Sequence, residues 1–593
     1  MTERGLLPAQ KTAWWKEAVV YQIYPASFAD SNGDGIGDLE GVRRHLDHIQ
    51  SLGATMLWLC PHLESPNVDM GYDISDYERI QPGYGDMNDM QKLIDDLHSR
   101  GMKIMFDLVV NHTSDKHAFF EESRSSRTNA KADWYIWRDA KINAAGQKSE
   151  PNNWASIWGG SAWTWDETRQ QFYLHLFSPQ QPDLNWDCPE VRQEILDIVT
   201  RWQRRGVDGW RLDAINFISK PQNSQDASLD LPDAPVTDPS SHYQPAFCRF
   251  NHGPNVHRYL KELYQQCLLP DVMTVGEAAQ TTPRQTAEYC SWERPDRELQ
   301  MVFGTDHVDL YGGFEIGPPK PLRHGDFIST VNKWATTLLE HGSWASVFVS
   351  NHDQPRPVNN ILRGSAPEHR VRAAKLLALF ECCLTGTLFV YQGEEIGMIN
   401  VPEDWPIEDY PDLVTQKFYS EELERRKKVS GSADPDMSDV MLGINRKARD
   451  NARVPMPWDD TPLAGFTTGR PWMRVNEDNR VCNVAAQVND KDSVLSFWKE
   501  CIALRKSHPA LNYGTFELVP ARGSEDVCSF VKRHGKDRLH FVANFGQTRA
   551  SVTIPALDLG HFELVKANVA SSAPLSDGDV FVLEPFEARL LIP

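Results

Sequence analysis

Eight short apolar runs, rich in β-branched and aromatic residues, recur over the first four-fifths of this 593-residue chain. They lie at 18–25, 55–61, 103–112, 207–214, 272–278, 300–304, 345–353 and 387–395. Helix-like segments separate several of them, at 41–52, 86–100, 189–205, 255–267 and 371–384. Alternating strands and helices imply a parallel sheet, and eight units predict a closed (β/α)8 TIM barrel, with a doubly wound open sheet as the alternative.

The segment 189–205 carries the clearest helix-end signals. Asp187 is a candidate N-cap, Pro189 fits the first turn, and Gly206 follows the last helical residue. We therefore expect this helix to lead directly into the strand at 207–214.

Two long excursions interrupt the alternation, at 114–187 and 396–460, and short alternating runs split by turn residues begin after residue 512. The first excursion is rich in Trp, Asn and Gly, and the second contains a charged helical piece. We predict three domains, which are a catalytic barrel (1–113 and 188–512), an inserted subdomain (114–187) and a C-terminal antiparallel β-sandwich (513–593).

Charge and cysteine usage restrict the partners and the compartment. The formal net charge of −21 argues against nucleic acid and anionic membranes, which both favour a basic face. The ten cysteines are scattered without a C-x-x-C pair, so buried free thiols are expected rather than a disulfide framework. No secretory signal and no membrane-spanning run is visible, so we expect a cytoplasmic protein, either a monomer or a weak homo-oligomer.

Charged and polar residues stand at the carboxyl ends of four predicted strands. These ends carry Asp107, Asn111 and His112; Arg211 and Asp213; Glu277; and Asn351, His352 and Asp353. Arg211 and Asp213 are two positions apart, so they share one strand face. In a barrel these ends converge on the face that carries active sites.

Paired carboxylates at such a face suit the cleavage of a glycosidic bond. A retaining hydrolase needs one carboxylate as nucleophile and another carboxyl group as general acid, about 5–5.5 Å apart. Asp213, held by Arg211, suits the nucleophile, and Glu277, after a very apolar run, suits the acid because burial raises a carboxyl pKa. A rim network of ion pairs without chemistry is the alternative, and no H-x-x-x-H or similar spacing indicates a catalytic metal.

The chain resembles the α-amylase superfamily of glycoside hydrolases (family 13), in particular its branch of α-glucosidases, maltases and oligo-1,6-glucosidases. The resemblance spans most of the chain and rests on motifs in family order, which are "WWKEAVVYQIYPASFADSNGDGIGDLEG", "DMGYDISDY", "DLVVNHTSDKH", "QPDLNW", "GWRLDAINF", "VGEA", "VSNHDQPR" and "ARDNARVPMPW". It implies that Asp213 is the nucleophile, Glu277 the general acid/base, and Asp353 a third carboxylate that holds sugar hydroxyls and helps to distort the ring.

The same resemblance assigns the first sugar subsite. It implies that Arg211, His112 and His352 orient the glucosyl unit and that Tyr72 is its stacking floor. Asp69 and Arg449 would pair to close the pocket around the non-reducing end. The aromatic wall would come from Phe177 and Trp158, although many relatives have Phe at the position of Trp158. A closed pocket implies exo action on a small α-glucoside.

The residue after the expected nucleophile bears on the linkage. In this branch Val is typical of 1,6-specific enzymes, whereas Thr or Ala accompanies α-1,4 activity, and here the residue is Ala214. We expect a retaining α-glucosidase for maltose and short maltosaccharides, with the glucosyl bond of sucrose as a further candidate.

The alternatives on the same scaffold are an oligo-1,6-glucosidase and a transglucosidase or sucrose isomerase. The arginine-rich "RLDR"-type stretch of the isomerases is absent from "QPRPVNNILR". A non-catalytic relative that escorts transporters should have a membrane span and should lack the carboxylates, and neither applies here.

A second site is predicted near the N-terminus, where "DSNGDGIGD" (30–38) resembles the front half of a calcium loop. The ligands would be Asp30, Asn32, Asp34, the Ile36 carbonyl and Asp38, and relatives carry a structural calcium there. Gly41 stands where the loop's last Glu belongs, so an Asx-rich turn is the alternative. No organic cofactor is expected.

Overall fold

The predicted strands form one parallel sheet in a computed structural model. The structure describes residues 12–592 apart from 143–145, 224, 227, 269–270, 293, 295, 311–315, 318–321, 365, 555–562 and 570–579. The first residues of the predicted barrel, 1–11, lie outside the described part. The strands are β1 (Val19–Ile23), β2 (Met56–Leu59), β5 (Lys103–Val109), β11 (Gly209–Asp213), β12 (Met273–Glu277), β13 (Met301–Phe303), β14 (Ser346–Val347) and β15 (Thr387–Tyr391).

These strands follow one another around a barrel. The sheet order is β13-β12-β11-β5-β2-β1-β15-β14, and every ladder in it is parallel. The last strand, β15, pairs with the first, and the Ser346 hydroxyl of β14 donates a hydrogen bond to the Val302 carbonyl of β13 at 3.1 Å. The predicted (β/α)8 barrel is therefore confirmed, and it excludes an open doubly wound sheet.

The strands of the barrel are buried on both faces because helices cover it. Every residue of β1, β2 and β15 is buried, as expected for a parallel sheet inside a helical layer. The covering helices include α4 (Met87–Ser99), α6 (Pro189–Arg204), α8 (Val256–Gln266), α11 (His324–Glu340) and α13 (Pro367–Cys383).

The predicted N-cap of α6 is wrong. The cap position is Cys188, which directly precedes Pro189 at the first helical position. The Asp187 carboxylate instead accepts hydrogen bonds from the Tyr259 hydroxyl and from the Asn255 side chain of the neighbouring segment. A tertiary contact thus displaces the local cap.

A small sheet forms inside the first excursion. Strands β6 (Trp137–Arg138), β10 (Gln171–Leu174) and β9 (Trp163–Asp166) pair antiparallel. Their apolar side chains form a second core together with residues from the segment after β11, including Phe217 and Phe250. The insertion therefore packs on the rim of the barrel beside the end of β11.

The C-terminal part folds as two antiparallel sheets. One has the order β16-β17-β18-β22-β20, and the other pairs β19 with β21; a shared apolar core joins them. The strands are β16 (Glu517–Leu518), β17 (Val527–His534), β18 (Asp537–Asn544), β19 (Ala550–Thr553), β20 (Glu563–Ala567), β21 (Val580–Leu583) and β22 (Ala588–Ile592).

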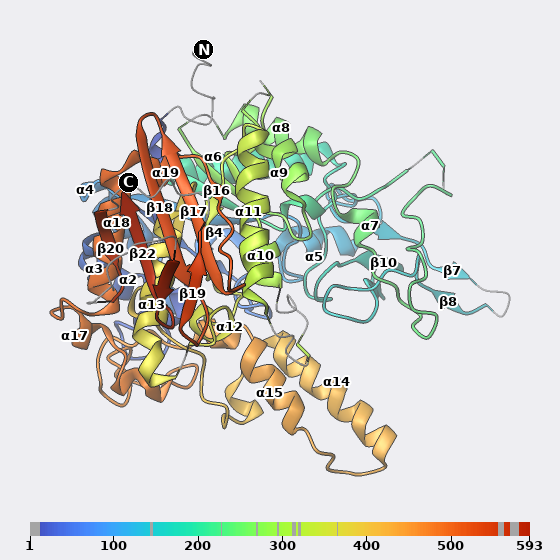
Figure 1. The fold of residues 1–593 in the computed structure, drawn as a ribbon. Coiled ribbons are helices and arrows are strands. Elements are labelled where there is room, and N and C mark those ends of the chain that lie inside the picture. Colours follow the sequence, from blue (N-terminus) through green and yellow to red (C-terminus); the bar gives the residue numbers. More distant parts are fainter. Residues whose placement is uncertain are drawn as a thin grey trace.

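The two longest helices of the excursion after β15 are α14 (Leu413–Ser430) and α15 (Ser438–Lys447). Figure 1 shows them as a pair that projects from the body of the molecule. All ten cysteines are free thiols. Within the described residues, no helix is long and apolar enough to cross a bilayer.

Candidate active site

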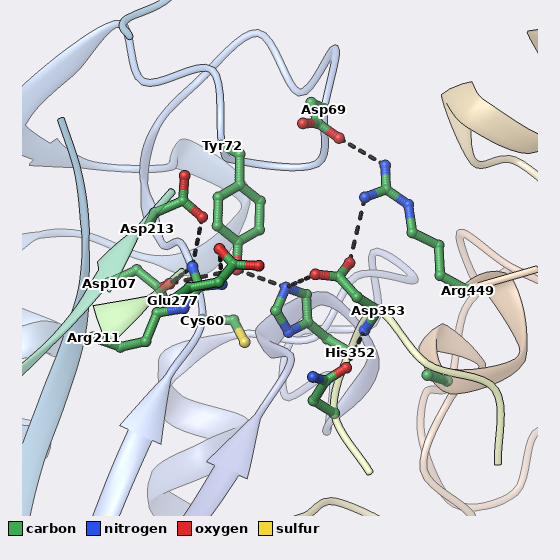
Figure 2. Close-up of polar contacts among 12 residues, drawn as sticks. Cys60, Asp69, Tyr72, Asp107, Arg211, Asp213, Glu277, His352, Asp353 and Arg449 are labelled. Atoms are coloured by element: carbon green, nitrogen blue, oxygen red, sulfur yellow. Dashed lines mark hydrogen bonds and ion pairs between the residues drawn. The ribbon is translucent and has the colours of Figure 1, made fainter. Parts of the chain in front are cut away.

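One buried arginine binds three carboxylates at the ends of neighbouring strands (Figure 2). Arg211 Nη1 lies 2.6 Å from Asp107 Oδ1 and 2.6 Å from Asp213 Oδ1, and Nη2 lies 2.7 Å from Glu277 Oε2. Parallel register explains the convergence, because Arg211 on β11 is aligned with Asp107 on β5 and with Val275 on β12. Two strand neighbours thus present their carboxyl groups to one guanidinium.

Burial raises the pKa of all three carboxyl groups, and the positive charge of Arg211 opposes it. The pKa of Asp213 is raised to about 6 and that of Asp107 to about 6. The pKa of Glu277 is raised to about 7, first by burial and then by the negative charges of Asp213 and Asp353. Near neutral pH, Asp213 is therefore mostly ionised, while Glu277 keeps its proton in a large fraction of molecules.

The residue after Asp213 has a left-handed backbone. Ala214 has φ 43° and ψ 37°, an uncommon conformation for a residue with a Cβ. Its amide N–H donates to Glu277 Oε2 at 3.3 Å. This backbone turn therefore links the two carboxylates that Arg211 also joins.

Asp353 lies in a different electrostatic environment. Arg453 Nη2 lies 2.8 Å and Arg449 Nη1 3.3 Å from its Oδ1, while His352 Nε2 lies 3.1 Å from its Oδ2. Burial would raise the pKa of Asp353, but His352 and the two arginines together hold it well below its usual range. This carboxylate remains ionised across the physiological range.

Hydrogen bonds fix the ring of His352. Gln22 Nε2 donates to its Nδ1 at 2.9 Å, and burial lowers the pKa of His352, so the ring is neutral with its proton on Nε2. That nitrogen faces the Tyr72 hydroxyl at 2.7 Å and Asp353. The Tyr72 ring stacks on His352 with centroids 5.5 Å apart and planes at 10°.

The expected ion pair between Asp69 and Arg449 is present. Arg449 Nη2 lies 2.8 Å from Asp69 Oδ1, and Gln181 donates to the other oxygen of Asp69 at 3.1 Å. A residue that carried no signal in the sequence holds this arginine, since Asp412 Oδ2 lies 2.7 Å from Arg449 Nε and 2.8 Å from Arg453 Nη1. The "ARDNAR" motif contains both arginines, so the second could have been identified from it.

Aromatic rings line one wall. Phe177 packs edge-on against His112, with ring centroids 5.1 Å apart, and against Trp158 at 5.6 Å. The Arg449 guanidinium lies 5.5 Å from the Trp158 ring centroid. Trp158 thus occupies the wall position that the sequence suggested.

These residues surround one cavity of about 800 Å³. Its lining includes Asp213, Glu277, Asp353 and the predicted binding residues Asp69, Tyr72, His112, Phe177 and Arg449. Arg211 and His352, which were also expected to orient the glucosyl unit, are not among the lining residues and instead contact Asp213, Glu277, Tyr72 and Asp353. Asp309 and residues of α14, which the sequence did not indicate, also line it.

Hydrogen bonds from backbone amides to aspartate side chains hold the predicted calcium loop together. Asp30 accepts from the amides of Asn32, Gly33 and Gly35, and Asp38 caps helix α2 (Leu39–Arg44) through Gly41 N. No cluster of three His, Cys, Asp or Glu suited to a metal occurs among the described residues. The atoms of 30–38 that would bind a metal are nevertheless all oxygens, the ligand type that calcium requires.

The barrel, the strand-end carboxylates and the cavity between them together define a class, the glycoside hydrolases built on a (β/α)8 barrel. Comparison with known sequences identifies the family. Residues 22–514 match the profile described as "Alpha amylase, catalytic domain", and the chain belongs to the α-amylase family, family 13 of the glycoside hydrolases. The protein is an enzyme of this family.

Full-length relatives agree with this assignment. The chain is 41% identical to an α-glucosidase of Schizosaccharomyces pombe, with 99% of both chains covered, and 42% identical to an oligo-1,6-glucosidase of Bacillus cereus, with 97% of this chain and 99% of the relative covered. Solved structures that superpose on it include an isomaltulose synthase mutant of Erwinia rhapontici in complex with sucrose (TM-score 0.88, 34% identity, 98% and 100% coverage) and a trehalulose synthase MutB mutant with Tris (TM-score 0.89, 35% identity, 98% and 100% coverage).

Replacing Arg211 should make the fold sensitive to alkaline pH. The pKa of an unfolded Asp or Glu is about 4, whereas Asp213 and Glu277 titrate near 6 and 7, so the folded state holds extra protons and loses stability as pH rises through this window. In Arg211→Met the carboxyl pKa values rise further. We expect the Tm deficit relative to wild type to be larger at pH 8 than at pH 5.

The matched control is Arg44→Met, which removes an exposed arginine paired with Glu40. Its Tm deficit should be small and nearly independent of pH. An equal Tm loss at pH 5 and pH 8 in Arg211→Met would show that the guanidinium does not balance these carboxylates.

Proposed function

We propose that this protein is an exo-acting, retaining α-glucosidase that releases glucose from the non-reducing end of maltose and short α-1,4-glucosides, with sucrose as a further substrate. One observation carries the proposal. Asp213 and Glu277 are bound to the same guanidinium in a single cavity, which the Asp69–Arg449 ion pair also lines. Retaining hydrolysis needs two carboxyl groups on either side of one sugar bond.

In the first step, an Asp213 oxygen attacks the anomeric carbon of the bound glucosyl unit. The carbon–oxygen bond to the leaving sugar breaks, and Glu277 transfers its proton to that oxygen. The pKa order fits these roles, because Glu277 (about 7) keeps its proton at a pH at which Asp213 (about 6) is ionised. The product is a glucosyl ester on Asp213.

In the second step, water replaces the leaving sugar. Glu277, now ionised, accepts a proton from the water. The water oxygen bonds to the anomeric carbon, and the ester bond to Asp213 breaks. Glucose leaves, and both carboxyl groups return to their initial states. Asp353 remains an anion throughout, which suits a group that accepts hydrogen bonds from sugar hydroxyls.

Relatives named oligo-1,6-glucosidase match this chain as well as those named α-glucosidase, so the 1,6 linkage is the second candidate. Ala214 favours the 1,4 linkage, because a small side chain in the left-handed turn beside Asp213 leaves room for a differently angled acceptor sugar. A transglucosidase is the third candidate, because the structural neighbours include sucrose isomerases.

We further propose a cytoplasmic location and a monomer or weak homo-oligomer. Ten free thiols, eight of them buried, suit a reducing compartment. Cell fractionation and size-exclusion chromatography test the two points.

Activity should follow the two carboxyl groups. We expect kcat/KM on p-nitrophenyl α-glucoside to be highest between pH about 6, where Asp213 becomes ionised, and pH about 7, where Glu277 loses its proton. Asp213→Ala should lower kcat by at least about 10³-fold. Asp434→Ala, on an exposed loop, is the control. Full activity in Asp213→Ala would refute the mechanism.

A larger side chain at residue 214 should shift the linkage preference. In Ala214→Val we expect the ratio of kcat/KM for isomaltose to that for maltose to rise roughly tenfold, a typical effect of one or two methyl groups in a pocket. Val also fits the left-handed backbone less well than Ala, so Tm should fall. Ala214→Gly separates the effects, because it relaxes the backbone without adding volume. No shift in Ala214→Val would refute the linkage assignment.

We also propose that calcium binds loop 30–38. If it does, EDTA should lower Tm by a few degrees and added calcium should restore it, since a ligand of the folded state stabilises it by mass action. Asp34→Ala should lower Tm and abolish the response. Equal Tm values with EDTA and with calcium would assign the loop to an Asx-rich turn.

A further inference from the structure

Helix α14 forms a wall of the cavity that no sequence motif indicated. Four of its residues line the cavity, Val414, Lys417, Phe418 and Glu421. Their spacing of three and four places them on one helix face. This wall therefore belongs to the excursion after β15 and lines the same cavity as the strand-end carboxylates.

The start of α14 is tied to Arg449 and Arg453, the arginines that bind Asp353. Asp412 is its N-cap and accepts from Val414 N at 3.0 Å through Oδ1, while Oδ2 binds Arg449 and Arg453. The Thr415 hydroxyl donates to Asp450 Oδ2 at 2.7 Å. The first turn of the helix is thus held in place by Asp450 and by the two arginines that bind Asp353.

One turn further on, a lysine crosses to the inserted subdomain. Lys417 Nζ donates to the Trp158 carbonyl at 2.5 Å and to the Gly159 carbonyl at 3.0 Å, and lies 3.8 Å from Glu421. Gly159 and Gly160 have φ angles of 87° and 79°. The two carbonyls that Lys417 binds therefore belong to a turn that needs glycine, at the position where the insertion meets the cavity.

The two hydrogen bonds from Lys417 hold the backbone that carries the Trp158 ring, which is part of the aromatic wall. The Trp158 ring packs between Phe177 and the Arg449 guanidinium, and Phe177 packs on His112. We propose that Lys417 is a positioning residue that latches loop 156–160 to α14. This latch holds Trp158 against the first subsite and narrows the mouth of the cavity, which favours short substrates over long chains.

This proposal rests on the proposed exo-glucosidase function and deepens it. In Lys417→Met, the stem remains but the two hydrogen bonds are lost. We expect KM for maltose to rise roughly fivefold with kcat changed less than twofold. The ratio of kcat/KM for maltotetraose to that for maltose should rise severalfold, because the loosened mouth admits longer chains. A merely structural role would change kcat and KM for both substrates alike.

Two variants make the test specific. Lys428→Met, an exposed lysine on the same helix, should behave as wild type. In a double-mutant cycle, Lys417→Met should add no further change once Trp158→Ala is present, because both act through one loop. Additive effects, or an unchanged maltotetraose-to-maltose ratio in Lys417→Met, would overturn the latch. If the enzyme cleaves isomaltose but not maltose, the linkage proposal fails, and the isomaltose series tests the latch in the same way.

Discussion

The guanidinium of Arg211 is the interaction on which the rest of the site depends. It is buried at the end of β11 and is the common partner of Asp107, Asp213 and Glu277. Buried ion pairs contribute little net stability, because removing charges from water costs about as much as their attraction returns. The arginine therefore acts chiefly by holding the three carboxyl groups together, while apolar strands such as β1 and β15 stabilise the barrel around it.

Two clusters with different charge ratios explain why neighbouring carboxyl groups behave differently. One arginine shared by three carboxylates does not offset their burial, so Asp213 and Glu277 titrate near 6 and 7. Around Asp353, a hydrogen bond from the neutral ring of His352 and the positive charges of two arginines more than offset it, and its pKa falls well below the usual range. The same kind of group, a carboxyl, is thus held ionised in one place and has a raised pKa in another.

Local sequence patterns predicted the barrel strands and the carboxylates at their ends. The eight strands follow from apolar runs, and the convergence of Asp213, Glu277 and Asp353 follows from barrel geometry once these runs are read as strands. Asp412 could not be predicted, since its role arises only when a distant loop folds over Arg449. The N-cap at Asp187 failed for the same reason, because a tertiary partner took its carboxylate. The left-handed backbone of Ala214 also had no sequence signal.

The distribution of roles between barrel and insertions has a physical cause. Groups that exchange protons and bonds must be held within fractions of an ångström, and the strand ends of a closed barrel supply that rigidity through ladders on both sides. Groups that select a substrate need only set the shape of the opening, which loops and helices can do with a few side-chain to carbonyl contacts. Trp158 and Lys417 lie in two insertions, one after the third barrel strand and one after the eighth, that contact each other beside the cavity. Changes there can alter which sugars enter while Arg211 and its carboxylates stay as they are.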